Sequence, residues 1–281
     1  MATSAEAGAT PVPFPNIVTT AFSSNGQLLA EETEELLTAG LSAMKAELAK
    51  NPAWSGAPSP ADGFLLMFLR AEVFSASAAA ERYRKFWKSK VLLCGEEKAA
   101  SPIKAEDIMA GLNMKYIQLM PGIRDSEGRQ VVLMTPGNLD RSVDRKIRVL
   151  ALWYILLAAL EDVETQRKGF CFVGVANTLK IGQTDFKFNK IAMGSVQGAL
   201  PVRIGSINIC YPTSFFRVIW AVVSNFLHER VKNRVRVLSG TDAEVQNALR
   251  PVVAPESLPP PLGQRASEFS MWLEECIRNE S

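Results

Sequence analysis

The stretch GFCFVGV, residues 169–175, is apolar throughout and is bounded by glycine. Its length and its Phe and Val content predict a strand buried on both faces, as strands of parallel sheets are. Two further runs, Arg203–Cys210 and Arg234–Leu238, look like strands, and helical patterns over 185–198 and 212–227 separate them. This alternation of strands and helices implies right-handed crossovers, and hence an α/β fold with a mostly parallel sheet.

Upstream of this core the pattern changes twice. Two short strands are expected over Lys115–Met120 and Gln130–Met134, followed by a long apolar helix over Asp144–Asp162. Earlier still, residues 27–100 show helical apolar spacing with a Pro-rich break at 51–60, which predicts a separate helical domain. The expected organisation is a disordered leader over 1–26, the helical domain over 27–100, an α/β domain over 101–263 and a closing helix or tail over 264–281.

Composition excludes several classes of function. With 31 Lys and Arg against 29 Asp and Glu, the net charge of +2 is too balanced for a protein that binds nucleic acid through bulk charge. The lone His228 has no nucleophile pattern beside it, and no glycine-rich phosphate loop or metal-ligand spacing occurs. We therefore expect no enzyme, no cofactor and no metal site. Scattered cysteines, the absence of a signal peptide and the lack of a membrane-length apolar run favour a cytosolic protein.

The helical pattern over 215–227 is unusually apolar, because only Arg217 interrupts it with charge. Apolar residues cover more than one of its faces, so the helix is either fully buried or presents its second face to a membrane. Four cations follow within seven residues: Arg230, Lys232, Arg234 and Arg236. Such a run is usually a solvated face, but beside a membrane-facing helix each cation adds ~1 kcal/mol of attraction to an anionic leaflet.

Several motifs occur in a fixed order between residues 64 and 263. They are FLLMFLRA at 64–71, PGIRDSEGRQV at 121–131, PGNLD at 136–140, EDVETQRKG at 161–169, LPVRIGSI at 200–207, YPTSFFRVIW at 211–220, FLHERVKNR at 226–234, and Leu258-Pro259 before Gly263. In order and spacing they resemble the CRAL-TRIO lipid-binding family, and within it the tocopherol- and retinaldehyde-binding branch.

The resemblance implies a fold and a function. The fold is a helical N-terminal domain on an α/β domain whose sheet floors a closed hydrophobic pocket, with the 212–227 helix as its gate. The function is binding one lipophilic small molecule, tocopherol- or retinoid-like, and moving it between membranes without covalent chemistry. Docking to an anionic, phosphoinositide-containing membrane is also implied. The alternative is a phosphoinositide-responsive adaptor that has lost its cargo, and the oligomeric state is left open.

The resemblance also assigns candidate site residues. The expected lipid-pocket residues are Leu152, Leu156, Phe170, Phe172, Val175, Phe186, Ile207, Ile209, Phe215, Phe216, Ile219 and Val223. The expected phosphoinositide-binding residues are Arg203, Arg230, Lys232 and Arg234. From composition alone, the apolar set would be ordinary core, because protein interiors are close-packed. As a pocket it should enclose several hundred Å³.

The sequence also departs from the family pattern. Glu72 stands where relatives have arginine, and Val175 where they often have aspartate. Leu152 and Leu156 occupy positions where tocopherol-binding relatives place hydroxyl groups. The family's head-group contacts are therefore not carried over to this chain.

Overall fold

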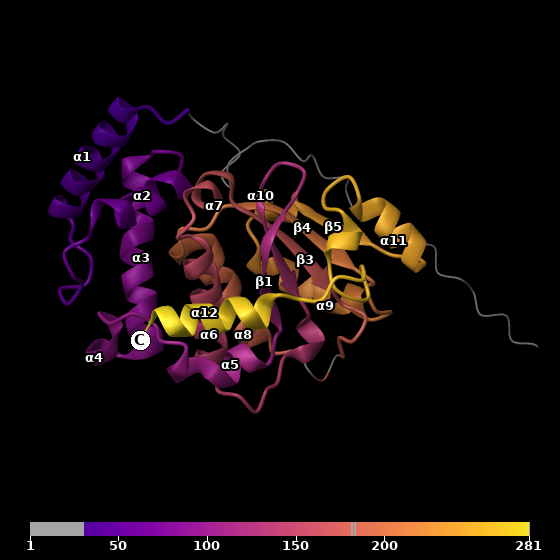
Figure 1. The fold of residues 1–281 in the computed structure, drawn as a ribbon. Coiled ribbons are helices and arrows are strands. Elements are labelled where there is room, and N and C mark those ends of the chain that lie inside the picture. Colours follow the sequence, from indigo (N-terminus) through magenta and orange to yellow (C-terminus); the bar gives the residue numbers. More distant parts are fainter. Residues whose placement is uncertain (1–30, 181, 183, 281) are drawn as a thin grey trace, which may run out of the picture.

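Five strands form one sheet in the order β1-β2-β3-β4-β5 (Figure 1). In this computed structural model, which describes residues 31–180, 182 and 184–280, β1 pairs antiparallel with β2, and all other neighbours are parallel. The strands are β1 (Ile117–Arg124), β2 (Gln130–Met134), β3 (Phe170–Val175), β4 (Ile204–Cys210) and β5 (Val235–Leu238). The expected α/β fold with a mostly parallel sheet is confirmed. The leader expected over 1–26 lies outside the described residues.

Helices precede, connect and follow the strands. The α-helices are α1 (Glu34–Lys50), α2 (Asp62–Ala71), α3 (Ala76–Cys94), α4 (Glu96–Ala99), α5 (Met109–Asn113), α6 (Arg145–Ala159), α7 (Val163–Lys168), α8 (Phe186–Gly194), α9 (Phe216–Val223), α10 (Glu229–Lys232), α11 (Asp242–Leu249) and α12 (Phe269–Asn279). Short 3-10 turns lie at η1 (Glu106–Ile108), η2 (Pro136–Asn138), η5 (Ser224–Phe226) and η6 (Pro255–Ser257), and a π-turn lies at η4 (Ser195–Ala199).

The long helix expected over 144–162 is α6, and a second, short helix, α7, follows just beyond the expected range. Helix α6 ends at Ala159, and Asp162 begins α7 by accepting hydrogen bonds from the backbone N–H groups of Glu164 and Thr165. An N-terminal cap of this kind favours a new helix over continuation of the old one. Glycine then ends α7, because Gly169 adopts φ +87° and a Cβ there would lie 2.5 Å from the Arg203 carbonyl oxygen.

The N-terminal helices share their core with the sheet domain. Rings of Phe64, Phe68, Tyr83 and Phe86 meet edge to face between α2 and α3. Phe86 then stacks on Trp153 of α6, with 5.1 Å between ring centroids. The buried side chains of both parts form one continuous cluster. The region is helical as expected, but it is not packed as a separate unit.

The C-terminal helix α12 links the two parts. In Figure 1 it runs across the front of the molecule, from the sheet back to the N-terminal helices. At its end, the Glu280 carboxylate accepts a hydrogen bond from the backbone N–H of Ala105 at 3.0 Å. Among the described helices none alone is long and apolar enough to cross a bilayer, although α2 and α3, bent by 111°, pass that test as a pair.

Candidate functional site

A cavity of about 220 Å³ lies between one face of the sheet and helices α6, α8 and α9. Its wall is almost entirely apolar. It is lined by Tyr116, Ile117, Met134, Pro136, Leu139, Leu152, Phe172, Gly174, Ala176, Leu179, Thr184, Asp185, Phe188, Asn189, Ala192, Met193, Val196, Ile204, Ile207, Ile209, Phe216, Ile219, Trp220, Val223, Leu227 and Val235. The cavity is where the sequence placed it, but it is smaller than the several hundred Å³ expected.

Seven of the twelve expected pocket residues line this cavity. They are Leu152, Phe172, Ile207, Ile209, Phe216, Ile219 and Val223. Period-two alternation of the strands sends Ile207 and Ile209 to the same face of β4. On α9 the lining residues are three and four positions apart, which is the spacing of one helical face.

Three other expected residues are core rather than cavity wall. Val175 alternates with Gly174 and so points to the opposite face of the sheet. Phe170 is fully buried at the start of β3, where its ring stacks on Phe172 at 5.9 Å between centroids. Leu156 is fully buried on α6, one turn beyond the lining residue Leu152. Placing these three residues in the cavity was therefore wrong.

Two expected residues on the covering helices also miss the cavity. Phe186 is 38% exposed, because it lies two positions before the lining residue Phe188 and so on the opposite side of α8. Phe215 is half-buried and precedes the first turn of α9, whose cavity-facing row begins at Phe216. Neither side chain contributes to the wall.

Residues outside the expected set close the cavity at the carboxyl ends of β2 and β3. Pro136 and Leu139 follow β2, and Leu179 follows β3. A polar group of lining residues was also not predicted: Thr184, Asp185 and Asn189. The general rule that ligands bind at the carboxyl ends of parallel strands was the available signal for Pro136, Leu139 and Leu179, but no sequence signal marked the polar group.

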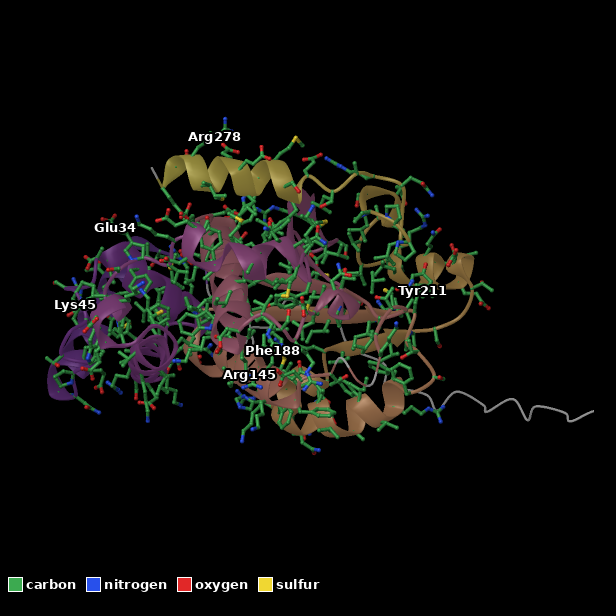
Figure 2. All side chains as sticks on the ribbon, turned by 90° about the horizontal axis from the view of Figure 1, so that it is seen from below. Glu34, Lys45, Arg145, Phe188, Tyr211 and Arg278 are labelled. Atoms are coloured by element: carbon green, nitrogen blue, oxygen red, sulfur yellow. The ribbon has the colours of Figure 1, made fainter. Side chains whose placement is uncertain are left out.

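Asp185 organises this polar end of the cavity. Its carboxylate accepts hydrogen bonds from Arg148 at 2.9 Å, from Arg145 at 3.1 Å and from the backbone N–H of Phe188 at 3.0 Å. Burial alone would raise the pKa of this carboxyl, but the Phe188 N–H and the two guanidinium groups outweigh burial and lower the pKa to about 2. Figure 2 labels Arg145 on α6 and Phe188 on α8, the two helices that these hydrogen bonds connect. The carboxylate therefore stays charged at neutral pH.

Helix α9 separates the cavity from solvent and is apolar on both sides. Phe216 and Ile219 are buried against the cavity, whereas Val218 is 60% and Val222 37% exposed. Ile191 on the neighbouring α8 is also exposed. The two alternatives raised by the sequence are thus resolved in favour of a half-buried helix with an exposed apolar face.

The expected basic residues divide between buried and exposed positions. Arg203 and Arg234 are buried at the N-terminal ends of β4 and β5, where Arg234 donates to the Ile204 carbonyl. Burial, together with the charges of Arg234 and Arg129, lowers the pKa of Arg203 to about 10. Arg230 is exposed beside them. We define Arg203, Arg230 and Arg234 as the basic edge; the buried Arg129 adds its charge nearby but is ion-paired with Asp125 and Glu127.

Lys232 does not join the basic edge as a free cation, because it pairs with Glu229 at 2.6 Å. Glu72 lies in a cleft with Arg230 and pairs with Arg82. Glu72 therefore brings a negative charge into the surroundings of Arg230.

A family model described as "CRAL/TRIO domain" matches residues 113–263, more than half of the chain. The chain belongs to the CRAL/TRIO family. This family consists of lipid-binding and lipid-transfer proteins, and the match covers the whole sheet and the cavity described above.

The chain is also similar to two relatives and to one solved structure. Human "alpha-tocopherol transfer protein-like" is 25% identical over 215 residues, which are 74% of this chain and 60% of that protein. Human "tyrosine-protein phosphatase non-receptor type 9" is 27% identical over 198 residues, which are 68% of this chain and 31% of that protein. The chain thus spans between about a third and three fifths of these relatives. The crystal structure of Sfh5 matches 90% of this chain and 100% of its own with a TM-score of 0.51 at 10% identity, which shows the shared fold.

Proposed function

We propose that this protein binds one lipophilic small molecule, tocopherol- or retinoid-like, in the cavity and transfers it between membranes. The observation that carries the proposal is the position of α9, which has one apolar face on the cavity and another on the surface. Such a helix would contact a bound lipid on one side and a membrane on the other, so it would be the barrier between them.

The apolar wall supplies the affinity. Each Å² of apolar ligand surface removed from water contributes ~25 cal/mol, so a largely apolar wall suffices to hold a lipid. The cavity of about 220 Å³ is smaller than the ~300–1,000 Å³ of typical ligand sites, so a larger cargo requires α9 to move outward. We infer that contact with a membrane favours that movement.

The exposed apolar face of α9 provides the contact. Val218 and Val222 would enter the interface of a bilayer, as residues of amphipathic membrane-surface helices do. Arg230 and Arg234 of the basic edge follow α9 in the chain, and the exposed Arg230 would meet the phosphates of an anionic leaflet. Head-group phosphates accept bidentate hydrogen bonds from guanidinium groups, so a phosphoinositide suits this edge.

The test is transfer between vesicles. Donor vesicles carry tritiated α-tocopherol or retinol, and acceptor vesicles either contain or lack a phosphoinositide. We expect the protein to transfer at least one probe faster than its spontaneous movement, and to do so faster still with phosphoinositide in the acceptor. Phosphoinositide-dependent vesicle binding without transfer of either probe would contradict the proposal and favour the cargo-free adaptor.

A further inference from the structure

The polar end of the cavity contains hydrogen-bonding capacity that the described residues leave unused. Asp185 already accepts three hydrogen bonds, which leaves room for a fourth on its carboxylate. Thr184 and Asp185 come from the segment before α8 and Asn189 from α8 itself, in a wall that is otherwise apolar. Tyr116 also lines the cavity, but its hydroxyl already donates to the Arg148 carbonyl at 2.7 Å. The unused capacity therefore lies on the side of α8.

Thr184 is the clearest case. Its Oγ1 is buried and has no hydrogen-bond partner among the residues that the structure describes. Leaving such a group unpaired costs ~1–3 kcal/mol, and most buried side-chain polar atoms find a partner. An unpaired hydroxyl in the wall of a cavity is accounted for when the partner is a ligand.

From this geometry we infer that the cargo is a lipophilic alcohol, whose neutral hydroxyl group binds between Thr184, Asp185 and Asn189. The inference rests on the proposed function and names its ligand class. A hydroxyl group both donates and accepts, so it can donate to the Asp185 carboxylate and accept from Thr184 or Asn189. An aldehyde only accepts, and so leaves the carboxylate without a new donor.

A fatty acid fits this end less well than an alcohol. Asp185 is the charged residue in the cavity wall, and a ligand carboxylate would lie against it as a like charge. Arg148, which neutralises Asp185, does not line the cavity. Its guanidinium packs instead on the ring of Phe188, 5.3 Å from the centroid, and that ring belongs to the wall. The charge that the cargo meets first is thus negative.

The experiment uses ligands that share one C15 skeleton and differ in their end group. Farnesol, farnesal, farnesoic acid and farnesene each displace Nile red from the full chain, and displacement gives their dissociation constants. Because a hydrogen bond to a charged group is worth ~1.5–3 kcal/mol, we expect farnesol to bind about tenfold more tightly than the other three.

Two variants assign that preference to the polar end. Thr184→Val keeps the shape and Asn189→Leu the approximate volume of the side chain. Because each removes a neutral hydrogen-bonding group, worth ~0.5–1.5 kcal/mol, each should weaken farnesol several-fold while leaving farnesene within twofold. Thr213→Val is the matched control, because the Thr213 hydroxyl is also buried without a described partner but does not line the cavity. Thermal melting establishes whether each variant is folded. If only one of the two pocket variants folds, that variant alone is enough to test the inference.

The outcomes separate this inference from the proposed function. If all four ligands bind equally, or if farnesoic acid binds best, the assignment of an alcohol is overturned while lipid binding stands. If Thr184→Val and Asn189→Leu both leave the preference for farnesol over farnesene unchanged, the polar end is not its source and the inference fails. If none of the ligands displaces Nile red, the proposed cargo function fails with it.

Discussion

Phe172 of β3 and Ile207 of β4 are direct partners in the parallel register, and both side chains face the cavity. The next pair on the same face is Gly174 with Ile209. The cavity therefore extends toward the sheet at Gly174, where β3 has no side chain. A Cβ built on Gly174 would have no heavy atom closer than 3.8 Å. The cavity depends on this missing side chain as much as on the residues present.

Filling that position should reduce the volume available to the cargo. Gly174→Val adds a branched side chain whose Cβ would be in ordinary van der Waals contact, no closer than 3.8 Å to its neighbours, and valine suits a strand, so stability should change by less than ~1 kcal/mol. We expect Nile red binding to weaken at least tenfold in a fluorescence titration. Gly63→Val, at an exposed position of α2 where a Cβ would have no heavy atom within 4 Å, is the control. Full binding by Gly174→Val would show that the dye sits elsewhere.

The exposed face of α9 should determine membrane contact. Val218→Asp places a charge on the most exposed apolar residue of the helix without touching the cavity wall. Because apolar burial is lost and a charge must enter the interface, vesicle association measured by sedimentation should fall about tenfold or more. Leu92→Asp on α3, equally surface-exposed, is the control. Similar losses in both variants would argue against a role for α9.

The basic edge predicts a smaller and salt-dependent effect. Arg230→Ala removes an exposed cation worth ~1 kcal/mol near an anionic surface, which is about fivefold in vesicle affinity. The loss should occur only with phosphoinositide and should vanish in high salt. Arg278→Ala on the outward side of α12 is the control (Figure 2). A variant of Arg234 is unsuitable, because that buried side chain bonds to the Ile204 carbonyl. If wild type and Arg230→Ala bind both kinds of vesicle equally, the Arg230 guanidinium is only a solvated surface charge and does not bind phosphoinositide.

Acid should remove the contribution of Asp185 to stability. The pKa of its carboxyl is lowered to about 2, against ~4 in an unfolded chain, so the charged form stabilises the fold. That contribution, ~2 kcal/mol, is complete above pH 4 and is lost as the pH falls toward 2. Urea unfolding at pH 7 and pH 3 should show wild type exceeding Asp185→Asn at pH 7 and approaching it at pH 3. A difference that does not change with pH would contradict this account.

The sequence predicted the sheet well because buried strands carry their own pattern. The run 169–175 is apolar from end to end, and β3 occupies Phe170–Val175 as a strand buried along its whole length. Strand periodicity, applied strictly, would also have excluded Val175 once Phe172 was placed in the cavity. The signal that excludes Val175 from the cavity wall is therefore present in the sequence.

The polar end of the cavity was harder to predict. Thr184 and Asp185 follow a segment with no regular periodicity, so nothing in the sequence shows that they turn back toward β3. Their position depends on the ion pair of Asp185 with Arg148, which lies 37 positions earlier on α6. A contact of this kind is a property of the tertiary structure. The sequence likewise does not show which side of α9 is exposed, because apolar residues cover more than one of its faces.

Organic-solvent extraction of the purified protein tests cargo binding most directly. Mass spectrometry of the extract gives the identity and the molar ratio of whatever lipid the chain carries. We predict about one lipophilic molecule per wild-type chain, and almost none in Ile209→Trp, whose indole would occupy the cavity between β4 and α9. Leu92→Trp, on the surface of α3, should retain it. A wild-type extract without stoichiometric lipid, or equal lipid in wild type and Ile209→Trp, would contradict the account.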